Sequence, residues 1–399
     1  MMRDRIRRWP GLFLGRGAAT VLVATLALLM SACGSDDSTP APAPAYPRDS
    51  ELRLNHIQVV GTHNSYHIEA PPALHAVIQR IDANLAMTLE YSHIALDQQF
   101  ETQGIRQVEL DVYADPNGGL YAHPKGLRIL TGDPNAHIPE LDAPGFKVLH
   151  VQDLDFMSNC KTLVVCLQTI KTWSAAHPGH VPITILIEAE DDDLGGIGVT
   201  EPVPFTAPVF DALDAEIRSV FAPGQIITPD EVRGDAATLE QAVRTRGWPT
   251  LGASRGRVLF LLDNGDHYKA DYIAGHPSLR GRILFTSSEP GEPEAAFIKL
   301  NDPLGDYDHI RDVVQQGFIV RTRADADTVE ARNGDTRPRD AALSSGAQFV
   351  STDYPIPDPR FGTYQVTIPM GAPARCNPIS APAACTSLDI ENPRYLSSK

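Results

Sequence analysis

The sequence predicts an α/β fold in the form of a single (β/α)8 barrel of the TIM type. Short apolar runs rich in β-branched residues recur along the chain, and such runs are typical of parallel strands that are covered on both faces. Segments with helical spacing separate them, and this alternation favours a barrel. The alternative is an open doubly wound sheet, but no Gly-rich phosphate loop follows the first run. The eight expected strands are residues 57–60, 107–112, 146–151, 183–189, 257–263, 283–287, 318–321 and 348–353.

Three of the intervening segments show the helical pattern most clearly. In each of them apolar residues recur every three or four positions, so one side of the expected helix faces a core. Gly317 then gives a stop signal for the third helix. The apolar positions are Leu163, Cys166, Leu167, Ile170 and Trp173 in the first segment, Phe210, Leu213, Ile217 and Val220 in the second, and Ile310, Val313 and Val314 in the third.

The N-terminal segment has the features of a secretory signal. Five arginines accompany a short apolar run over residues 18–30, which is too short for a comfortable transmembrane helix. Ser-Ala-Cys33 then resembles a bacterial lipobox with a lipidated Cys33; the alternative is an ordinary signal and a chance cysteine. We expect a signal peptide over residues 1–32, a flexible tether over 33–48 and one domain over 49–399. The chain is then exported, either as a membrane-anchored lipoprotein, with the outer membrane as the hypothesis, or as a secreted protein.

The chain is strongly acidic. Residues 1–32 hold five Arg and one Asp, so their removal changes the formal net charge from −16 to −20. Such a charge argues against nucleic acid or an anionic membrane as the main partner. A cation that neutralises a carboxylate cluster would account for part of the excess. No linker, composition shift or repeat interrupts residues 50–365, so we expect one domain and a monomer.

Four cysteines follow Cys33, and an even number in an exported chain favours disulfides. Their spacings suggest the pairs Cys160–Cys166 and Cys376–Cys385, with two other connectivities open. Because Cys166 lies on the apolar side of an expected helix, a free buried thiol is the alternative for the first pair.

Polar side chains gather where the expected strands end. His63 and Asn64 follow the first strand in the motif Gly-Thr-His-Asn-Ser-Tyr-His. Glu109 and Asp111 are two residues apart on the second strand, so both point to one face, and Glu188 ends the fourth. These carboxylates repel one another unless a cation lies between them. Since the amide and carboxylates offer only oxygen, the sequence predicts Ca2+ or Mg2+ rather than zinc, and the alternative is solvated strand-end acids.

Two histidines lie beside these candidate ligands. His63 precedes Asn64, and His123 lies in Tyr-Ala-His-Pro soon after the acid pair. We expect both to transfer protons, because imidazole titrates near neutral pH. A hard cation and two histidines, with no obvious Ser or Cys nucleophile, fit phosphoryl transfer. His67 is expected in a surface or packing role, and His150, beside an expected strand, is left open.

Four motifs resemble those of the calcium-dependent phosphoinositide phospholipase C family, and the match is closest to its stand-alone bacterial and fungal branch. They are, in order, Gly-Thr-His-Asn-Ser-Tyr, Val-Glu-Leu-Asp-Val-Tyr, the following His-Pro and Ile-Glu-Ala-Glu. The resemblance implies that His63 stabilises the pentavalent phosphoryl group and that His123 protonates the diacylglycerol oxygen. It implies that the inositol 2-hydroxyl attacks its own phosphodiester, with Glu109 or Glu188 as base, to give a 1,2-cyclic phosphate. The Ca2+ ligands that it implies are Asn64, Glu109, Asp111 and Glu188.

The chain also departs from the animal members of that family, which use lysines after the fifth strand to bind ring phosphates. Residues 261–266 are Leu-Leu-Asp-Asn-Gly-Asp here, which favours phosphatidylinositol or another uncharged head group. Asp263 is a candidate for hydrogen bonds to sugar hydroxyls, or a plain strand-end acid. Arg321, ahead of Arg323, is a candidate for phosphate contact, and a rim ion pair is the alternative.

Two other functions stay open. A glycerophosphodiester phosphodiesterase would share the barrel, the acid pair and two histidines, but its first motif normally reads His-Arg-Gly where this chain has His63-Asn-Ser. A surface lipoprotein that binds sugars or lipid head groups without turnover would not need a cation site. We therefore favour Ca2+-dependent cleavage of phosphatidylinositol, a phospholipid substrate at a membrane surface, to diacylglycerol and a cyclic or open inositol phosphate.

Overall fold

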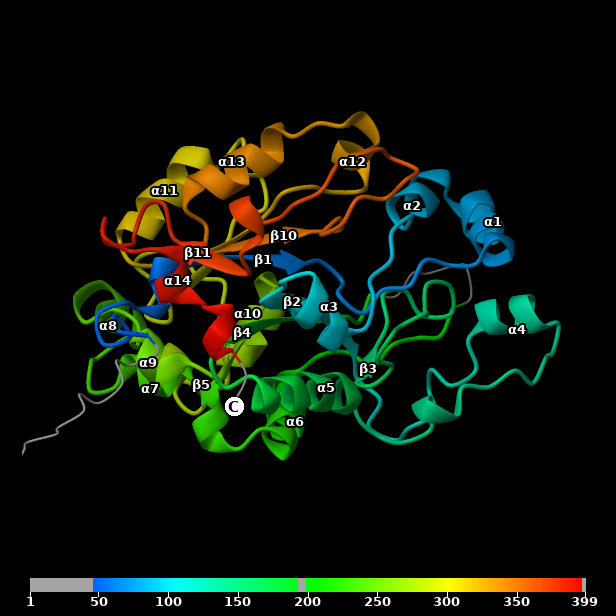
Figure 1. Ribbon diagram of the computed structural model, residues 1–399. Helices are drawn as coiled ribbons and strands as arrows, with labels where there is room; N and C mark the ends of the chain where they lie inside the picture. The colour runs from blue at the N-terminus through cyan, green and yellow to red at the C-terminus, as the bar shows by residue number, and fades with distance from the viewer. Residues whose placement is uncertain (1–45, 193–198, 397–399) are drawn as a thin grey trace, which may run out of the picture. The chain divides into compact units, whose positions relative to one another are not determined.

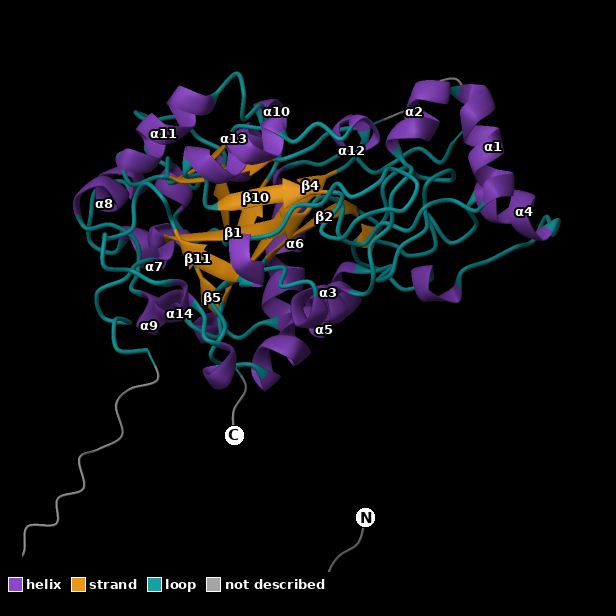
Figure 2. Ribbon diagram, turned by 45° about the horizontal axis from the view of Figure 1, so that its top comes forward, coloured by secondary structure: helices purple, strands orange, loops and turns teal. Residues whose placement is uncertain are grey.

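The computed structural model describes residues 46–192 and 199–396 of the chain (Figures 1 and 2). The predicted signal peptide, Cys33 and the first part of the tether lie outside the described residues. Tyr46 belongs to the predicted tether, yet it is buried, and its hydroxyl lies 3.3 Å from the carbonyl oxygens of both Gly179 and Asn392. Within the described ranges every helix is too short or too polar to span a lipid bilayer.

Eight parallel strands close into a barrel. Each strand pairs with the next, and β10 pairs with β1 again, so the ring is complete. Between β7 and β8 the connection is the single bridge of Ser287 with Phe297. The predicted (β/α)8 barrel is confirmed, and the open sheet is excluded. The strands are β1 Ile57–Thr62, β2 Gln107–Tyr113, β4 Ile183–Ala189, β6 Val258–Leu262, β7 Leu284–Thr286, β8 Phe297–Lys299, β9 Ile319–Arg323 and β10 Phe349–Thr352.

One expected strand lies outside the barrel, and one barrel strand was not expected. Within residues 146–151 the structure has only β3 (Lys147–Val148), which pairs antiparallel with β2. This run is apolar because Phe146, Val148 and Leu149 are buried beside the barrel, not because it enters the ring. The missed strand, β8, has three residues and is too short to give a clear apolar run.

Helices cover the outside of the barrel, as Figure 1 shows. In α5 the Thr162 side chain accepts a hydrogen bond from the Val165 backbone N–H, and the apolar positions predicted from spacing are buried. α1, α2 and α4 follow β1 and β2 and lie to one side of the barrel (Figure 2). The helices are α1 Pro72–Ile81, α2 Ala83–Thr88, α3 Leu96–Thr102, α4 Lys125–Thr131, α5 Leu163–Ala176, α6 Ala207–Val220, α7 Pro229–Arg233, α8 Leu239–Thr245, α9 Leu251–Ser254, α10 Asp266–Ile273, α11 Tyr307–Gln315, α12 Val329–Asn333, α13 Arg337–Ser345 and α14 Ser387–Ile390.

Short elements and two disulfides complete the fold. β5 (Ile226–Ile227) runs parallel to β6, and β11 (Ala374–Cys376) runs antiparallel to β1. Both predicted disulfides are present, Cys160–Cys166 and Cys376–Cys385, so the free-thiol alternative is wrong. Short 3-10 helices cover Leu54–His56, Pro139–Leu141, Pro223–Gln225, Pro277–Leu279, Pro369–Gly371 and Pro393–Tyr395.

The upper end of the barrel, where the parallel strands finish, carries buried charge. Side chains alternate along β2, so Glu109 and Asp111 share one face. Glu109 forms an ion pair with Arg321 of β9, two strands beyond β1 in the ring, so this shared face is the barrel interior. The register of β2 with β4 sets Asp111 beside Glu188. The candidate ligands thus lie at the end of the barrel where parallel strands of this fold carry their active sites.

Candidate active site

His63 is the first residue after β1, and its ring is held in one orientation. Nδ1 lies 2.8 Å from Asp353 Oδ1, while Nε2 lies 3.3 Å from Arg323 Nη1 and 3.8 Å from Glu109 Oε1. Burial, and then the positive charge of Arg323, lower the pKa of His63. A neutral ring that donates its Nδ1–H to Asp353 is therefore favoured, and this leaves Nε2 as a proton acceptor.

Three carboxylates converge at the top of the barrel interior. One oxygen each from Glu109, Asp111 and Glu188 lies within 4.8 Å of the other two. Burial, and then the charge of Glu188, raise the pKa of Asp111 well above its ordinary value; burial and the charge of Asp263 do the same to the pKa of Glu188. Like charges held together away from water have this effect. A divalent cation would remove the repulsion, and carboxylate oxygens are ligands that Ca2+ prefers.

Asn64 adds an amide to this group. It is 1% exposed and has a positive φ of 41° directly after His63. In one orientation of the amide, Nδ2 donates to Asp111 Oδ1 at 3.1 Å and the amide oxygen accepts from the Tyr91 hydroxyl at 3.3 Å. The opposite orientation turns the amide oxygen toward the Asp111 carboxylate, and two facing oxygens need a cation between them. The residues present therefore fit a hard cation with Asn64 as a fourth oxygen donor.

Two basic residues neutralise acids below this group. Arg321 is 1% exposed; its Nη2 pairs with Glu109, and its Nη1 donates to Asn301 Oδ1 at 2.7 Å. Lys299 pairs with Asp263 in the same way. Neither Arg321 nor Asp263 lines the cavity above them, so the predicted phosphate and sugar contacts do not fit their positions. The sequence pattern placed both residues near a strand end but gave no measure of their depth in the barrel.

A cavity of about 240 Å³ lies over the cluster. Arg323, two residues beyond Arg321 and on the same face of β9, reaches it and donates from Nη2 to Asp353 Oδ2 at 3.2 Å. Arg323 was the lesser of the two candidates for phosphate contact, and it is the arginine that the cavity exposes. The lining residues are His63, Asn64, Thr88, Leu89, Tyr91, Asp111, His150, Glu188, Glu190, Arg323, Asp327 and Asp353.

The second histidine in the cavity is His150, not His123. His123 is exposed, its Nδ1 lies 3.0 Å from the Ala136 carbonyl oxygen, and its ring stacks on His137 with centroids 4.8 Å apart. His123 lies on the loop between β2 and α4, which leads away from the barrel. Its nearness to Asp111 in sequence therefore does not bring the two residues together in space. His150 lines the cavity, and its Nδ1 lies 2.9 Å from Asp155 Oδ2.

Position at the end of an expected strand identifies His63, and the same criterion identifies two further residues of the site. Both His150 and Asp353 come at the end of an expected strand, 146–151 and 348–353 respectively. Strand-end position is therefore a better guide to this site than closeness in sequence to the acid pair. Tyr91, by contrast, gave no sequence signal, because it lies in a loop far from every expected strand.

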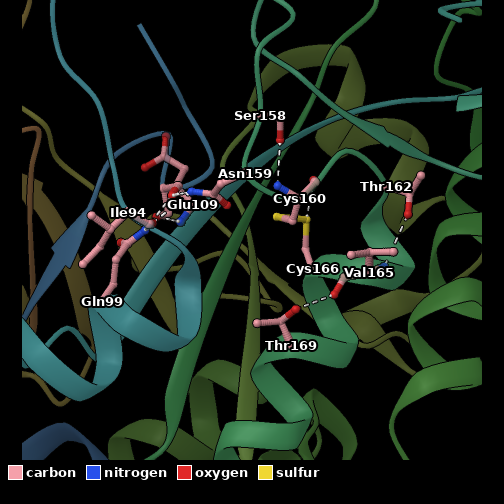
Figure 3. The surroundings of a disulfide bond; sticks show 11 residues. Ile94, Gln99, Glu109, Ser158, Asn159, Cys160, Thr162, Val165, Cys166 and Thr169 are labelled. Carbon is pink, nitrogen blue, oxygen red and sulfur yellow. Dashed lines mark hydrogen bonds between the residues drawn. A yellow bond between two sulfur atoms is a disulfide. The ribbon is translucent and has the colours of Figure 1, made fainter. Parts of the chain in front are cut away.

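The disulfide Cys160–Cys166 fixes the segment that follows His150 to α5 (Figure 3). Next to it, the Asn159 side-chain amide donates to the carbonyl oxygens of Ser65 at 3.2 Å and Ile94 at 3.0 Å. The Ser65 hydroxyl in turn accepts from the Glu109 backbone N–H at 2.8 Å. The loops that carry His63 and His150 and the strand that carries Glu109 are therefore joined by direct hydrogen bonds.

Comparisons with known proteins identify a family and structures of similar fold. A family model described as "Phosphoinositide phospholipase C, Ca2+-dependent" matches residues 52–378. Two solved structures of a calcium-dependent phosphoinositol-specific phospholipase C from a Gram-negative Pseudomonas sp., an apo crystal form and a myoinositol complex, each share 17% identity at a TM-score of 0.50 and cover 84% of this chain and 100% of their own. A Ca2+-dependent phosphatidylinositol-specific phospholipase C from Streptomyces antibioticus shares 19% identity, covers 76% of this chain and 95% of its own, and has a TM-score of 0.47. The comparison with curated proteins gave no match.

Proposed function

Because the chain belongs to the Ca2+-dependent phosphoinositide phospholipase C family, we propose that it cleaves the phosphodiester of phosphatidylinositol and releases diacylglycerol and an inositol phosphate. One observation carries this assignment. Two histidines, one arginine and two members of the three-carboxylate cluster, Asp111 and Glu188, line a single cavity. A glycerophosphodiester phosphodiesterase is the weaker alternative, since the family match lies with the phospholipases.

Each group has a role that follows from its position. His63 and Arg323 lie side by side on one wall. The positive guanidinium of Arg323 would stabilise negative charge on a phosphoryl group, and the Nε2 atom of His63 would accept a proton. His150 lies in the same cavity, and we assign to it the protonation of the leaving diacylglycerol oxygen. Asn64, Glu109, Asp111 and Glu188 would hold the cation. When bound, Ca2+ supplies charge that lowers the pKa of the attacking inositol hydroxyl.

The cavity favours an inositol ring without added phosphates. Of the described residues that line it, none is a lysine, and Arg323 is the one arginine, already paired with Asp353. Glu190 and Asp327 add acidic groups to the wall. A ring that carries further phosphates would meet this negative charge, whereas hydroxyl groups can donate hydrogen bonds to it.

Action at a membrane surface is supported by helices α1 and α4, which lie to one side of the barrel (Figure 2). α1 and α4 pack together, and Ile81 and Ile129 on them are 47% and 46% exposed. Arg80 and Arg128 are exposed beside these two isoleucines. Apolar side chains with neighbouring arginines suit the interface of a lipid bilayer. Replacing Ile81 and Ile129 with Ser should weaken binding to phosphatidylinositol vesicles, whereas Met370→Ser, at a residue that is 95% exposed elsewhere, should not.

Export with a lipid anchor on Cys33 remains part of the proposal. The basic and apolar pattern of residues 1–32 and the Ser-Ala-Cys sequence support it. Cys33→Ser should release the protein from the membrane fraction; a variant that still sediments with membranes would overturn the anchor. We also propose that the enzyme works as a monomer, which its mass in solution by light scattering would test.

The reaction itself is tested by inositol phosphate release from phosphatidylinositol vesicles with Ca2+, with Mg2+ and with a chelator. We expect release with Ca2+, none after chelation, and a loss of about 10²–10⁴-fold in kcat for both His63→Ala and His150→Ala. His123→Ala is the matched control, because that ring is exposed and outside the cavity. Equal losses at His123 and His150 would refute the site. Cleavage of glycerophosphoinositol but not of the lipid would move the assignment to the alternative.

A further inference from the structure

A buried chain of three side chains lies behind the cavity. His150 Nδ1 lies 2.9 Å from Asp155 Oδ2, and His67 Nε2 lies 3.1 and 2.9 Å from the two oxygens of the same carboxylate. The side chains of His67 and Asp155 are fully buried, while that of His150 is 26% exposed where it meets the cavity. The order His67–Asp155–His150 thus runs from the interior of the protein to the proposed proton donor.

The partners of His67 define its protonation. Its Nδ1 lies 3.0 Å from the Tyr91 backbone carbonyl oxygen, and its Nε2 faces the Asp155 carboxylate. A carbonyl and a carboxylate only accept, so both ring nitrogens must carry a hydrogen. His67 is then a buried imidazolium, and with ionised Asp155 it forms a neutral pair. This agrees with the direction of both shifts: despite burial, the charge of Asp155 raises the pKa of His67, and the charge of His67 lowers that of Asp155.

The same arrangement determines which nitrogen of His150 faces the substrate. Because Asp155 only accepts, His150 must carry its hydrogen on Nδ1, and Nε2 is the atom left for the cavity. Backbone hydrogen bonds also hold the turn from His150 to Asp155. The Asp155 backbone carbonyl accepts from the N–H groups of His150 at 3.2 Å and Val151 at 3.1 Å. Asp155 therefore holds the backbone of His150 through its carbonyl oxygen and the His150 ring through its carboxylate.

The chain of three also joins the two halves of the site. The segment that holds His67 pairs with the segment after Asp155: the Ile68 N–H donates to Met157 O at 3.2 Å, and the Asn159 N–H donates to Tyr66 O at 2.8 Å. His67 lies four residues after His63, so its pair with Asp155 bridges the loops of both histidines.

We propose that Asp155 and His67 are positioning residues for the phosphodiester cleavage. Asp155 keeps the Nδ1–H of His150 toward itself and Nε2 toward the leaving group, so that a proton carried on Nε2 passes to the leaving diacylglycerol oxygen and the neutral Nδ1–H tautomer remains. Protonated His67 holds Asp155 in place and cancels its charge. This inference rests on the proposed function for the role of His150. The geometry of the three side chains stands apart from that role, so it can be tested by itself.

The first test is nitrogen NMR of the full chain with ¹⁵N-labelled histidine, which distinguishes protonated from unprotonated ring nitrogens. In the parent protein we expect both nitrogens of His67, and Nδ1 of His150, to be protonated near neutral pH. An unprotonated nitrogen on His67, or the Nε2–H tautomer on His150, would overturn the proposal whether or not the protein cleaves phosphatidylinositol. A parent protein with the expected spectrum but no cleavage would instead refute the proposed function and leave the arrangement intact.

The second test uses two near-isosteric variants. Asp155→Asn turns an acceptor into a possible donor, so we expect the His150 tautomer to change and kcat to fall by about 10²–10⁴-fold with KM changed far less. His67→Gln keeps a donor to Asp155 but removes the charge, and we expect about a tenfold fall in kcat with the His150 tautomer retained. Matched controls are Asp142→Asn and His137→Gln, a surface pair 2.7 Å apart, which should leave kcat unchanged. Folded Asp155→Asn protein with parental kcat and tautomer would overturn the proposal, and if it does not fold, the parent spectrum decides.

Discussion

Charged side chains are buried at both ends of the barrel, but their surroundings differ. At the lower end, where the strands begin, Arg106 Nε lies 3.0 Å from both oxygens of Glu391, and its Nη1 donates to the carbonyl oxygens of Phe100 and Ile105. Glu391 accepts in addition from the Val181 backbone N–H at 3.0 Å. At the upper end, Asp111 and Glu188 lie side by side with the same sign of charge.

The lower pair contributes to stability, whereas the upper carboxylates belong to the candidate active site. The lower pair is balanced, and Arg106 holds the pKa of Glu391 below its ordinary value although burial opposes this. The upper carboxylates have raised pKa values because of burial and then neighbouring negative charge, from Glu188 on Asp111 and from Asp263 on Glu188. The buried charges at the lower end therefore neutralise each other, whereas those at the upper end repel each other and would be stabilised by a bound cation. Four predictions test this contrast, beginning with the largest effect.

Removing the lower acid should cost the most stability. Glu391→Gln leaves Arg106 buried without a counter-ion, so we expect the free energy of unfolding to fall by about 3–5 kcal/mol. Activity per folded molecule should stay at the parental value, because Glu391 is far from the cavity. Denaturant unfolding and vesicle assays on the same preparation measure both. Parental stability in this variant would show that the Arg106–Glu391 pair does not stabilise the lower end of the barrel.

Removing an upper acid should do the opposite. Glu188→Gln removes one of the crowded charges, so the protein without Ca2+ should become no less stable, while kcat falls by about 10²–10³-fold through loss of a ligand. Chelator-treated protein is compared by denaturant unfolding, and activity is compared at saturating Ca2+. A clear loss of stability without Ca2+ would show that the upper cluster is balanced as well, contrary to our account.

Acid should weaken each end through one buried neutral histidine, and at the upper end protonation of Asp111 and Glu188 should oppose this loss because it removes their repulsion. Burial lowers the pKa of His180 at the lower end, and that of His93 beside His63, to about 4. The unfolded chain takes up these protons near pH 6.5, so stability that is fully present above that pH is lost as the pH falls toward 4, by about 3 kcal/mol for each histidine. Unfolding curves between pH 7.5 and 4.5 should show this slope, and His180→Gln should reduce it. An unchanged slope in that variant would contradict the role of His180.

Calcium should act on the upper end alone. At 100 times its dissociation constant, a ligand that binds only the folded state adds about 2.7 kcal/mol to the free energy of unfolding. We expect Ca2+ to raise Tm in the parent and in Glu391→Gln, but not in Glu188→Gln. Thermal unfolding with Ca2+ and with a chelator decides this. A shift that survives in Glu188→Gln would place the ion elsewhere.

The sequence predicted most of the barrel and the acidic half of the site, for one physical reason. Buried parallel strands need apolar runs, and polar residues at their ends stand out, as His63, Glu109, Asp111 and Glu188 did. What escaped prediction depends on long-range placement. Arg321 meets Glu109 across 212 positions of sequence, and no local pattern records that contact.

The short strand β8 and the second histidine that lines the cavity escaped prediction for related reasons. β8 is held by its neighbours in the ring rather than by a strong run of its own. His123 is closer than His150 to the acid pair in sequence, but the fold brings His150 and not His123 into the cavity. Depth within the barrel, which separates Arg321 from Arg323, is likewise a property of the assembled sheet.

The contact between Tyr46 and Tyr395 bears on how this protein can be handled. Their rings lie 5.9 Å apart at the lower end, where the Tyr46 hydroxyl also meets Gly179 just before β4. The first and last described parts of the chain thus leave the molecule at the same pole. A bead or sensor surface attached next to residue 46 or residue 396 would hold the protein by that pole and leave the opposite end of the barrel open to vesicles. The same proximity would let a short linker join residues 396 and 46 in a circular permutant, with new ends opened in an exposed loop.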